Sequence, residues 1–212
     1  MCLANTHMLV EAHDDSAFRT VLEHSDLTCP DGMPVAWLQR LGGSPTVSRV
    51  RGPDLMFEVV TASAREGIPI GLYGGRPDTL AALIDRLEHV APRLNIAYAH
   101  APPFRTLSES EDAGVTEAIT SSGARILFVG LGCPKQERWM AAHRDRVPAV
   151  MLGVGAAFDF HAGVVAQAPR WMQRTGLEWA HRLASDPRRL WRRYARTNPR
   201  FVALAIRDLL FK

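Results

Sequence analysis

The sequence predicts an α/β protein with a mostly parallel, Rossmann-like sheet and helices on both faces. Short apolar runs rich in β-branched residues recur between segments of helical periodicity, an order typical of this class. These runs are apolar throughout, which indicates strands covered on both faces. The chain has 212 residues, 47% hydrophobic and 22% charged, which suits a globular domain and excludes disorder, collagen-like repeats or coiled coil as the main architecture.

The elements follow one another in a regular order. We expect strands at residues 2–5, 68–73, 94–99, 126–130 and 149–152. We expect helices at residues 14–23, 33–41, 54–66, 77–90, 109–121 and 134–143. The helix at 77–90 has apolar residues at positions 80, 83, 84 and 87, the spacing of one buried face, and Pro77 suits its first turn. Gly123 is expected to end the helix before residue 126.

The composition changes after Pro169. Residues 170–212 contain ten arginines and one lysine against three acidic residues, a net charge of +8, whereas residues 1–169 carry −5. Three of the five tryptophans also lie in this segment. We therefore predict an α/β domain at residues 1–169 and a basic helical appendage at residues 170–212. Pro187 and Pro199 are expected to divide the appendage into short helices.

Several classes of protein are excluded by what the sequence lacks. The three cysteines match no metal spacing and the eight histidines include no HExxH, so no metal site is expected. No segment has the form GxGxxG or GxxxxGK[ST], which disfavours a dinucleotide cofactor or a P-loop. The longest apolar run, at 149–158, is far shorter than the roughly 20 residues of a membrane span. With no signal peptide, we expect a cytoplasmic protein.

Small residues follow the expected strands, where ligands of open α/β sheets bind. Backbone N–H groups at glycines and helix N-termini bind phosphate well. Steric need more often explains a single such turn, but four of them in one sheet favour a ligand site. The candidates are Gly74 and Gly75, Gly130 and Gly132, Gly155, and the pair Asn5 and Thr6.

The turn at Gly130 leads into a helix that carries the only lysine of the first 169 residues. Lys135 and Gln136 stand in the first turn of this helix, where both are placed to contact an anion. A solvated helix start explains the same residues equally well.

Other polar residues also allow two interpretations. Asp31 precedes a helix, so it is either a helix cap or a general base. Arg49 and Arg51 lie in a loop and are either solvated or a clamp for an anion. Asp159 stands between two phenylalanines, where either a ribose or base ligand or backbone amides would satisfy a buried carboxylate.

Five segments resemble the WecG/TagA/CpsF glycosyltransferases, and together they span nearly the whole chain. They are DGMPVAWLQR from residue 31, RVRGPDL from 49, GLGCPKQERWM from 130, GVGAAFDFHAG from 153, and APRWMQRTGLEWAHRLASDPRRLWRRY from 168. The resemblance implies transfer of a sugar, of N-acetylmannosamine type or another hexose, from a UDP-sugar to a polyprenyl-pyrophosphate-linked sugar. It further implies inversion at the anomeric carbon without metal or other cofactor, in the synthesis of teichoic acid, capsule, exopolysaccharide or common antigen.

The resemblance also implies roles for individual residues. Asp31 is expected to be the general base, and Asn5, Arg49 and Gln136 to surround it in the donor and acceptor site. Asp159 is expected to hold the uridine end, with the glycine turns around the diphosphate. Three appendage arginines are expected to stabilise the leaving diphosphate in place of a metal. They are Arg182, Arg189 and Arg192.

At two places the chain departs from the family pattern. Leu3 stands where relatives often have threonine, so a hydroxyl contact is either lost or supplied by Thr6. Relatives usually carry a further segment before the first strand, so either the start is misassigned or this member lacks that segment.

The appendage also suggests where the protein acts. In this family it is thought to dock on the cytoplasmic face of the membrane, and arginines interleaved with Trp, Phe and Leu suit an anionic lipid surface. A basic helix bundle that packs only on the rest of the protein is the alternative. Two competing functions are a nucleic-acid-binding protein that uses the +8 segment and a nucleotide-binding regulator with an inactive site. A nucleic-acid binder would leave the glycine turns and Asp31 without a purpose, so we expect no nucleic-acid partner.

Overall fold

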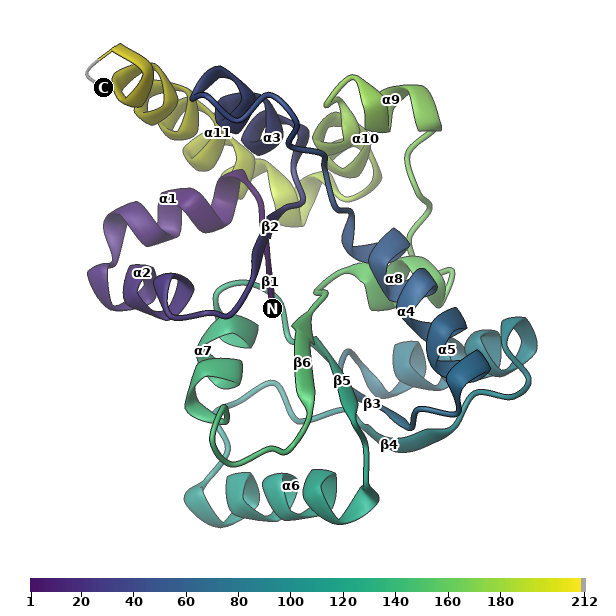
Figure 1. Ribbon diagram of the computed structural model, residues 1–212. Helices are drawn as coiled ribbons and strands as arrows, with labels where there is room; N and C mark the ends of the chain where they lie inside the picture. The colour runs from purple at the N-terminus through teal and green to yellow at the C-terminus, as the bar shows by residue number, and fades with distance from the viewer. Residues whose placement is uncertain (211–212) are drawn as a thin grey trace. The chain divides into compact units, whose positions relative to one another are not determined.

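The computed structural model describes residues 1–210, except for the side chain of Arg189, and confirms the predicted fold class. Its six strands form one all-parallel sheet in the order β2-β1-β6-β5-β3-β4 (Figure 1). The strands are β1 (Cys2–Ala4), β2 (Thr28–Pro30), β3 (Ile70–Gly74), β4 (Ile96–His100), β5 (Ile126–Gly130) and β6 (Val150–Gly153).

The chain forms two compact units, each made from two segments. The first contains Met1–Cys2 and Gly52–Val165, and the second contains Leu3–Arg51 and Ala166–Lys212. The C-terminal segment therefore shares its unit with residues near the N-terminus. The predicted division at residue 169 stays a prediction.

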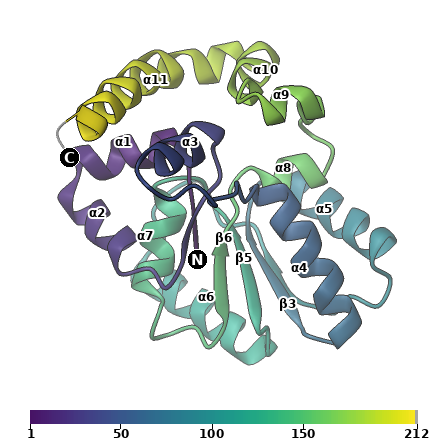
Figure 2. The ribbon, with the colours of Figure 1, turned by 45° about the horizontal axis from the view of Figure 1, so that its top comes forward.

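The first unit has helices on both faces of its strands. Helices α4 (Gly52–Glu66) and α5 (Pro77–Val90) cover one face, and α6 (Glu109–Ser122) and α7 (Lys135–Ala142) cover the other (Figure 2). In β3 and β5, Ile70, Leu72 and Leu127 are fully buried, as strands covered on both faces require. A short helix, α8 (Ala157–His161), follows β6.

The expected helix ends in this unit are confirmed. Pro77 lies in the first turn of α5, and Gly123 ends α6 in the left-handed conformation with φ 74°. Ser108 and Glu111 form a capping box at the start of α6. These local features position the strands whose ends carry the glycine turns.

The second unit contains the remaining helices. They are α1 (Thr6–Asp14), α2 (Ser16–Glu23), α3 (Met33–Leu41), α9 (Arg170–Arg174), α10 (Glu178–Ser185) and α11 (Pro187–Leu210). Val10 of α1, Val35 of α3 and Phe201 of α11 form its hydrophobic core, and α11 runs beside α1 (Figure 1).

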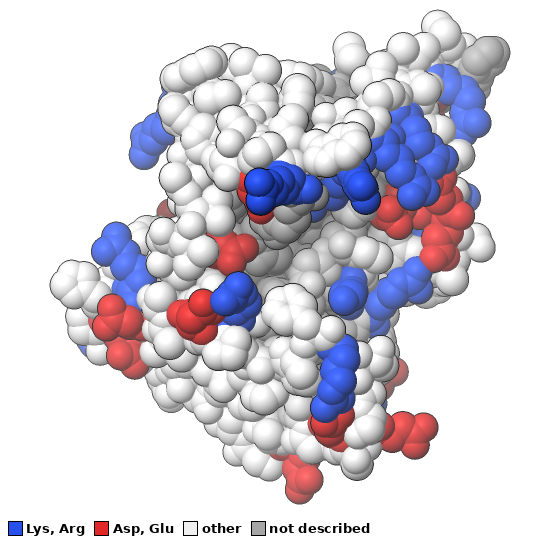
Figure 3. All heavy atoms as spheres, turned by 180° about the vertical axis from the view of Figure 1, so that it is seen from behind, with Lys and Arg blue, Asp and Glu red and all other residues white. Residues whose placement is uncertain are grey.

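Charged side chains also join α11 to α1 at the surface. Arg200 donates two hydrogen bonds to Asp14, at 2.6 and 2.5 Å. Figure 3 shows this part of the surface, where basic side chains of the C-terminal helix lie beside acidic ones. Part of the +8 charge of the segment is therefore balanced within its own unit.

Some expected elements were wrong or missed. Pro199 does not separate two helices, because α11 continues through it; buried side chains on both sides of the proline, Leu190 and Phe201, hold the helix in place. The strand expected at 2–5 ends at Ala4, and the helix expected from residue 14 begins at Ser16.

Three short elements have no counterpart in the expected set: α1, β2 and α8. In α1 the buried residues Met8, Val10 and Ala12 recur every second position, a spacing that does not indicate a helix. Within residues 1–210, no helix combines the length and the apolar character needed to cross a bilayer.

Candidate active site

Asn5 and Asp31, both in the second unit, directly follow two neighbouring strands. Asn5 comes after β1 and Asp31 after β2, and the backbone N–H groups of Asp31 and Gly32 donate to the carbonyl of Ala4 at 2.8 and 3.4 Å. A Cβ atom on Gly32 would lie 3.7 Å from the Cα of Asn5. The structure thus brings together two of the residues for which the sequence predicts a catalytic role.

The side chain of Asn5 has a local task. Its Oδ1 atom accepts a hydrogen bond from the N–H of Met8 at 3.1 Å and so caps α1. Thr6 begins that helix and is half-buried, whereas Leu3 is buried in the strand before it.

Asp31 does not occupy the capping position of α3. That position belongs to Gly32, whose φ and ψ are extended and which has no side chain to cap the helix. The carboxylate keeps 28% of its surface exposed beside the guanidinium of Arg49. The N-cap is therefore Gly32 and not Asp31, and the interpretation of Asp31 as a base stays a prediction.

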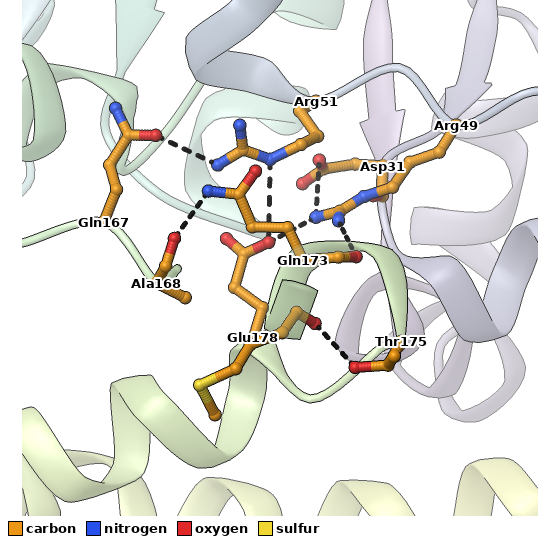
Figure 4. A network of polar contacts seen from close by, with 9 residues as sticks. Asp31, Arg49, Arg51, Gln167, Ala168, Gln173, Thr175 and Glu178 are labelled. Atoms are coloured by element: carbon orange, nitrogen blue, oxygen red, sulfur yellow. Dashed lines mark hydrogen bonds and ion pairs between the residues drawn. The ribbon is translucent and has the colours of Figure 1, made fainter. Parts of the chain in front are cut away.

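Arg49 is held by three partners, which Figure 4 shows. Its Nε donates to the carbonyl of Asp31, its Nη1 to the carbonyl of Gln173 at 3.1 Å, and its Nη2 to Glu178 at 2.7 Å. Nη2 also lies 3.9 Å from Oδ1 of Asp31. Only 12% of the Arg49 side chain is exposed, so the alternative of a solvated loop arginine is wrong.

Arg51 enters the same network from two residues further along. Its Nη2 donates to Gln167 at 3.2 Å, and its Nε lies 3.6 Å from Oε2 of Glu178 (Figure 4). Its side chain is 10% exposed, so it is not a solvated arginine either. The same Oε2 atom of Glu178 therefore faces both guanidinium groups.

Glu178 is a residue that the sequence reasoning did not select. It lies in the Gly-Leu-Glu-Trp segment, which contributed to the resemblance but received no role of its own. A carboxylate in a segment so rich in arginine was the available signal. Its partner Arg49, however, lies 129 positions away in the sequence and is not visible in any local pattern.

In the first unit, the glycine turns are packed closely against one another. A Cβ atom on Gly74, whose φ is 127°, would lie 2.6 Å from the carbonyl oxygen of Gly130, and the N–H of Gly75 donates to that same oxygen at 3.1 Å. A Cβ atom on Gly130 would clash with the ring of Phe158 at 2.8 Å. Steric need therefore accounts for these three glycines without any ligand.

Gln136 and Glu137 are both buried at the start of α7. Gln136 accepts a hydrogen bond from the N–H of Gly132 at 3.2 Å and donates to Glu137 at 2.7 Å. Burial raises the pKa of Glu137 above its usual 4.5, although hydrogen bonds from Gln136 and Cys133 act in the opposite direction. The expectation of a solvated helix start is wrong for Gln136, and Lys135 beside it is exposed.

Comparison with known proteins decides the family. The profile described as "Glycosyl transferase WecG/TagA/CpsF family" matches residues 1–212. This chain belongs to the WecG/TagA/CpsF glycosyltransferase family. It is also 30% identical over 205 residues to the N-acetylglucosaminyldiphosphoundecaprenol N-acetyl-beta-D-mannosaminyltransferase of Bacillus spizizenii, over 96% of this chain and 77% of the relative. The protein is a glycosyltransferase.

The other predicted site residues of this glycosyltransferase are distributed over both units. In the first unit, Asp159 of α8 is half-buried rather than buried, and the residues that are buried are its neighbours Phe158 and Phe160. Gly155 lies beside Gln136, since its Cβ atom would be 3.5 Å from the Gln136 Oε1 atom. A Cβ atom on Gly132 would meet no neighbour within 4 Å.

The predicted appendage arginines of the glycosyltransferase lie on α10 and α11. Arg182 is half-buried on α10, and Arg192 is exposed on α11 with its Cζ atom 5.5 Å from the ring centroid of Trp191. Arg189 belongs to α11, but its side chain lies outside the described part of the structure. The described residues contain no group of three or more His, Cys, Asp or Glu side chains placed to hold a metal. Metal-independent transfer stays a prediction.

Proposed function

We propose that this glycosyltransferase moves an N-acetylmannosamine-type sugar from a UDP-sugar to a sugar linked to a polyprenyl diphosphate. Two findings support the proposal. The family profile covers the whole chain, and the relative from Bacillus spizizenii carries a name that specifies an N-acetylmannosaminyl transfer to N-acetylglucosaminyldiphosphoundecaprenol. The product would enter a cell-surface polysaccharide such as teichoic acid, capsule, exopolysaccharide or common antigen.

In the proposed reaction, Asp31 acts as the general base. Its carboxylate takes the proton of the acceptor hydroxyl while that oxygen forms a bond to the anomeric carbon of the donor. The bond between this carbon and the β-phosphate oxygen breaks, and UDP leaves with the electron pair. Attack from the face opposite to UDP inverts the anomeric centre.

The negative charge that develops on UDP needs cations or N–H donors. In the proposal, Arg182, Arg189 and Arg192 supply guanidinium groups that offset this charge. Lys135, exposed in the first turn of α7, and Asp159 would contact the diphosphate and the uridine, respectively.

The proposal also places the enzyme at the cytoplasmic face of the membrane, where the lipid-linked acceptor lies. The exposed face of α11 supports this placement at the membrane. One face, with Phe201, belongs to the core of the second unit, and the other exposes Val202 and Ile206, each 52% exposed, together with Leu210. Exposed Trp191 and Arg192 extend this second face toward the start of the helix. An apolar stripe with adjacent arginines suits an anionic interface.

The observation that carries the assignment of the base is the placement of Asp31. It lies at the carboxyl end of β2, where ligands of such sheets bind, next to Asn5 and in contact with the Arg49 guanidinium. The Asp31 side chain is 28% exposed, which leaves it accessible to a substrate hydroxyl.

Replacement of the carboxylate tests this role. We expect Asp31→Asn to lower transfer from UDP-N-acetylmannosamine to a short polyprenyl-diphosphate-linked N-acetylglucosamine by at least about 100-fold. UDP binding, measured by calorimetry, should survive, because the amide preserves the shape of the side chain. The matched control is Asp85→Asn on the exposed face of α5, which should leave the rate unchanged. Full activity of Asp31→Asn would contradict the assignment.

A further inference from the structure

Glu178, the first residue of α10, places one carboxylate oxygen between two guanidinium groups. Oε2 lies 2.7 Å from Nη2 of Arg49 and 3.6 Å from Nε of Arg51, and 15% of the Glu178 side chain is exposed. Two cations held this close repel each other in a partly buried site, and the carboxylate between them offsets that repulsion. Removal of the carboxylate would leave the two cations without their shared anion.

The guanidinium of Arg49 transmits the position of Glu178 to Asp31. While Nη2 donates to Glu178, Nε donates to the backbone carbonyl of Asp31 (Figure 4). The guanidinium is planar and rigid, so the partner at one end fixes the orientation at the other end. Nη2 also lies 3.9 Å from the Asp31 carboxylate, which is the next acceptor within reach if Glu178 is absent.

A second contact joins the turn before α10 to the segment that carries Asp31. Gly176 adopts a left-handed conformation with φ 73°, and a Cβ atom there would lie 2.7 Å from the Trp37 ring and 3.4 Å from the Cβ of Met33. Both neighbours belong to α3, which begins two residues after Asp31. The backbone next to Glu178 is therefore packed against α3 independently of the ion pairs.

We propose that Glu178 is a positioning residue of the transfer reaction. It holds Arg49 in the orientation in which Arg49 fixes the backbone of Asp31, and it keeps Nη2 of Arg49 away from the Asp31 carboxylate. Without Glu178, Arg49 turns to Asp31, so that the base is both displaced and engaged in a close ion pair. The inference rests on the proposed role of Asp31 as the base.

Steady-state kinetics on the full chain test this inference. We expect Glu178→Ala to lower kcat by roughly 10- to 100-fold, because a misplacement of about 1 Å has effects of that size. The KM for the UDP-sugar should change little. Glu178→Gln retains an oxygen that accepts from Arg49 but lacks the charge, so its kcat should lie between those of the wild type and Glu178→Ala. Glu117→Gln on the exposed face of α6 is the matched control.

A double-mutant cycle separates positioning from general stabilisation. In an Arg49→Lys background, the guanidinium through which Glu178 acts is gone, and we expect Glu178→Ala to lower kcat by less than about 3-fold. The same fold-loss in both backgrounds would overturn the inference, as would a wild-type kcat for Glu178→Ala. Thermal unfolding and UDP binding of each variant show that it is folded; should Glu178→Ala not fold, the near-isosteric Glu178→Gln is used in the same cycle.

The experiments distinguish an error in the role of Glu178 from an error in the proposed role of Asp31. If Asp31→Asn is fully active, the role of Asp31 is wrong, whatever the cycle shows. If Asp31→Asn is inactive while the effects of Glu178→Ala and Arg49→Lys simply multiply, only the role of Glu178 is wrong.

Discussion

At the scale of single residues, the start of α7 shows how an apparent surface pattern conceals burial. Lys-Gln-Glu after a glycine turn is a polar sequence, yet Gln136 and Glu137 are 4% and 1% exposed. The Oε1 atom of Glu137 accepts from Gln136, whereas its Oε2 atom is buried without a hydrogen-bond partner. Such a carboxylate is costly to ionise, which is why burial raises its pKa.

The raised pKa of Glu137 predicts a pH dependence of stability. The folded state disfavours the ionised carboxylate, whereas in the unfolded chain the group ionises near 4.5. As the pH rises above 4.5, the wild type should therefore lose stability relative to Glu137→Gln, until the folded-state pKa is passed. Urea unfolding at about pH 5 and at about pH 8 measures this difference.

The control for this prediction is Glu117→Gln, because Glu117 is exposed. Its free energy of unfolding should differ from that of the wild type by an amount that does not vary with pH. If the gap between the wild type and Glu137→Gln were equally constant, the ionisation of Glu137 would have no part in stability.

At the scale of elements, α11 has two apolar faces with different tasks. Phe201, Leu204 and Ala205 belong to the core formed with α1 and α3, whereas Val202 and Ile206 face outward. The sequence allowed two interpretations of this segment, a helix packed on the protein and a helix that binds a membrane. With two apolar faces, α11 can do both. Packing of the inner face also explains why α11 continues past Pro199, which local propensity alone would not allow.

The two faces predict effects of very different size when their side chains are truncated to alanine. Phe201→Ala should lower the free energy of unfolding by about 3–5 kcal/mol, because it removes a ring from the core. Val202→Ala, one position further along, should change it by less than about 0.5 kcal/mol, because the side chain is half exposed. Denaturant unfolding of the two variants checks the difference, and equal effects would show that Phe201 is not part of the core.

At the scale of the whole molecule, some of the basic residues behind the charge asymmetry are paired within the protein, and others are exposed to solvent. The segment from residue 170 carries +8. Some of its arginines have partners in the second unit, as Arg200 has in Asp14, but others on α11, such as Arg192 and Arg207, are exposed. Removal of the whole segment would uncover Val10 and Val35 of the core. A truncated protein that failed to bind membranes could therefore simply be unfolded.

Substitutions on the outer face of α11 test membrane binding without this complication. We expect the full chain to sediment with vesicles containing anionic phospholipid, and the double variant Val202→Ser, Ile206→Ser to bind them more weakly while unfolding as the wild type does. Binding should also weaken as salt is raised, since each arginine near the surface contributes roughly 1 kcal/mol. Undiminished binding of the double variant would show that this face is not the contact.

The local sequence determined those features that depend on residues close together in the chain. Apolar runs predicted the buried strands, and Pro77 and Gly123 predicted the helix ends. The resemblance to the family, rather than a strand pattern, implied that Asn5 and Asp31 share a site. Some short elements were not predicted because their buried residues do not have the expected spacing. In α1, for example, every second residue from Met8 to Ala12 is buried, which is not a helical spacing.

Tertiary structure alone decided the partners and the burial of the charged residues. Arg49 is not the solvated arginine that its loop allowed, because Glu178, 129 positions away, accepts one of its hydrogen bonds. Helix α11 is continuous because Phe201 packs against Val10 and Val35, which are distant in sequence. Periodicity and capping act over a few residues, whereas an ion pair or a core contact depends on which segments the fold brings together. The sequence by itself thus determined the type of fold and the family, and the tertiary structure decided how Asp31 is held.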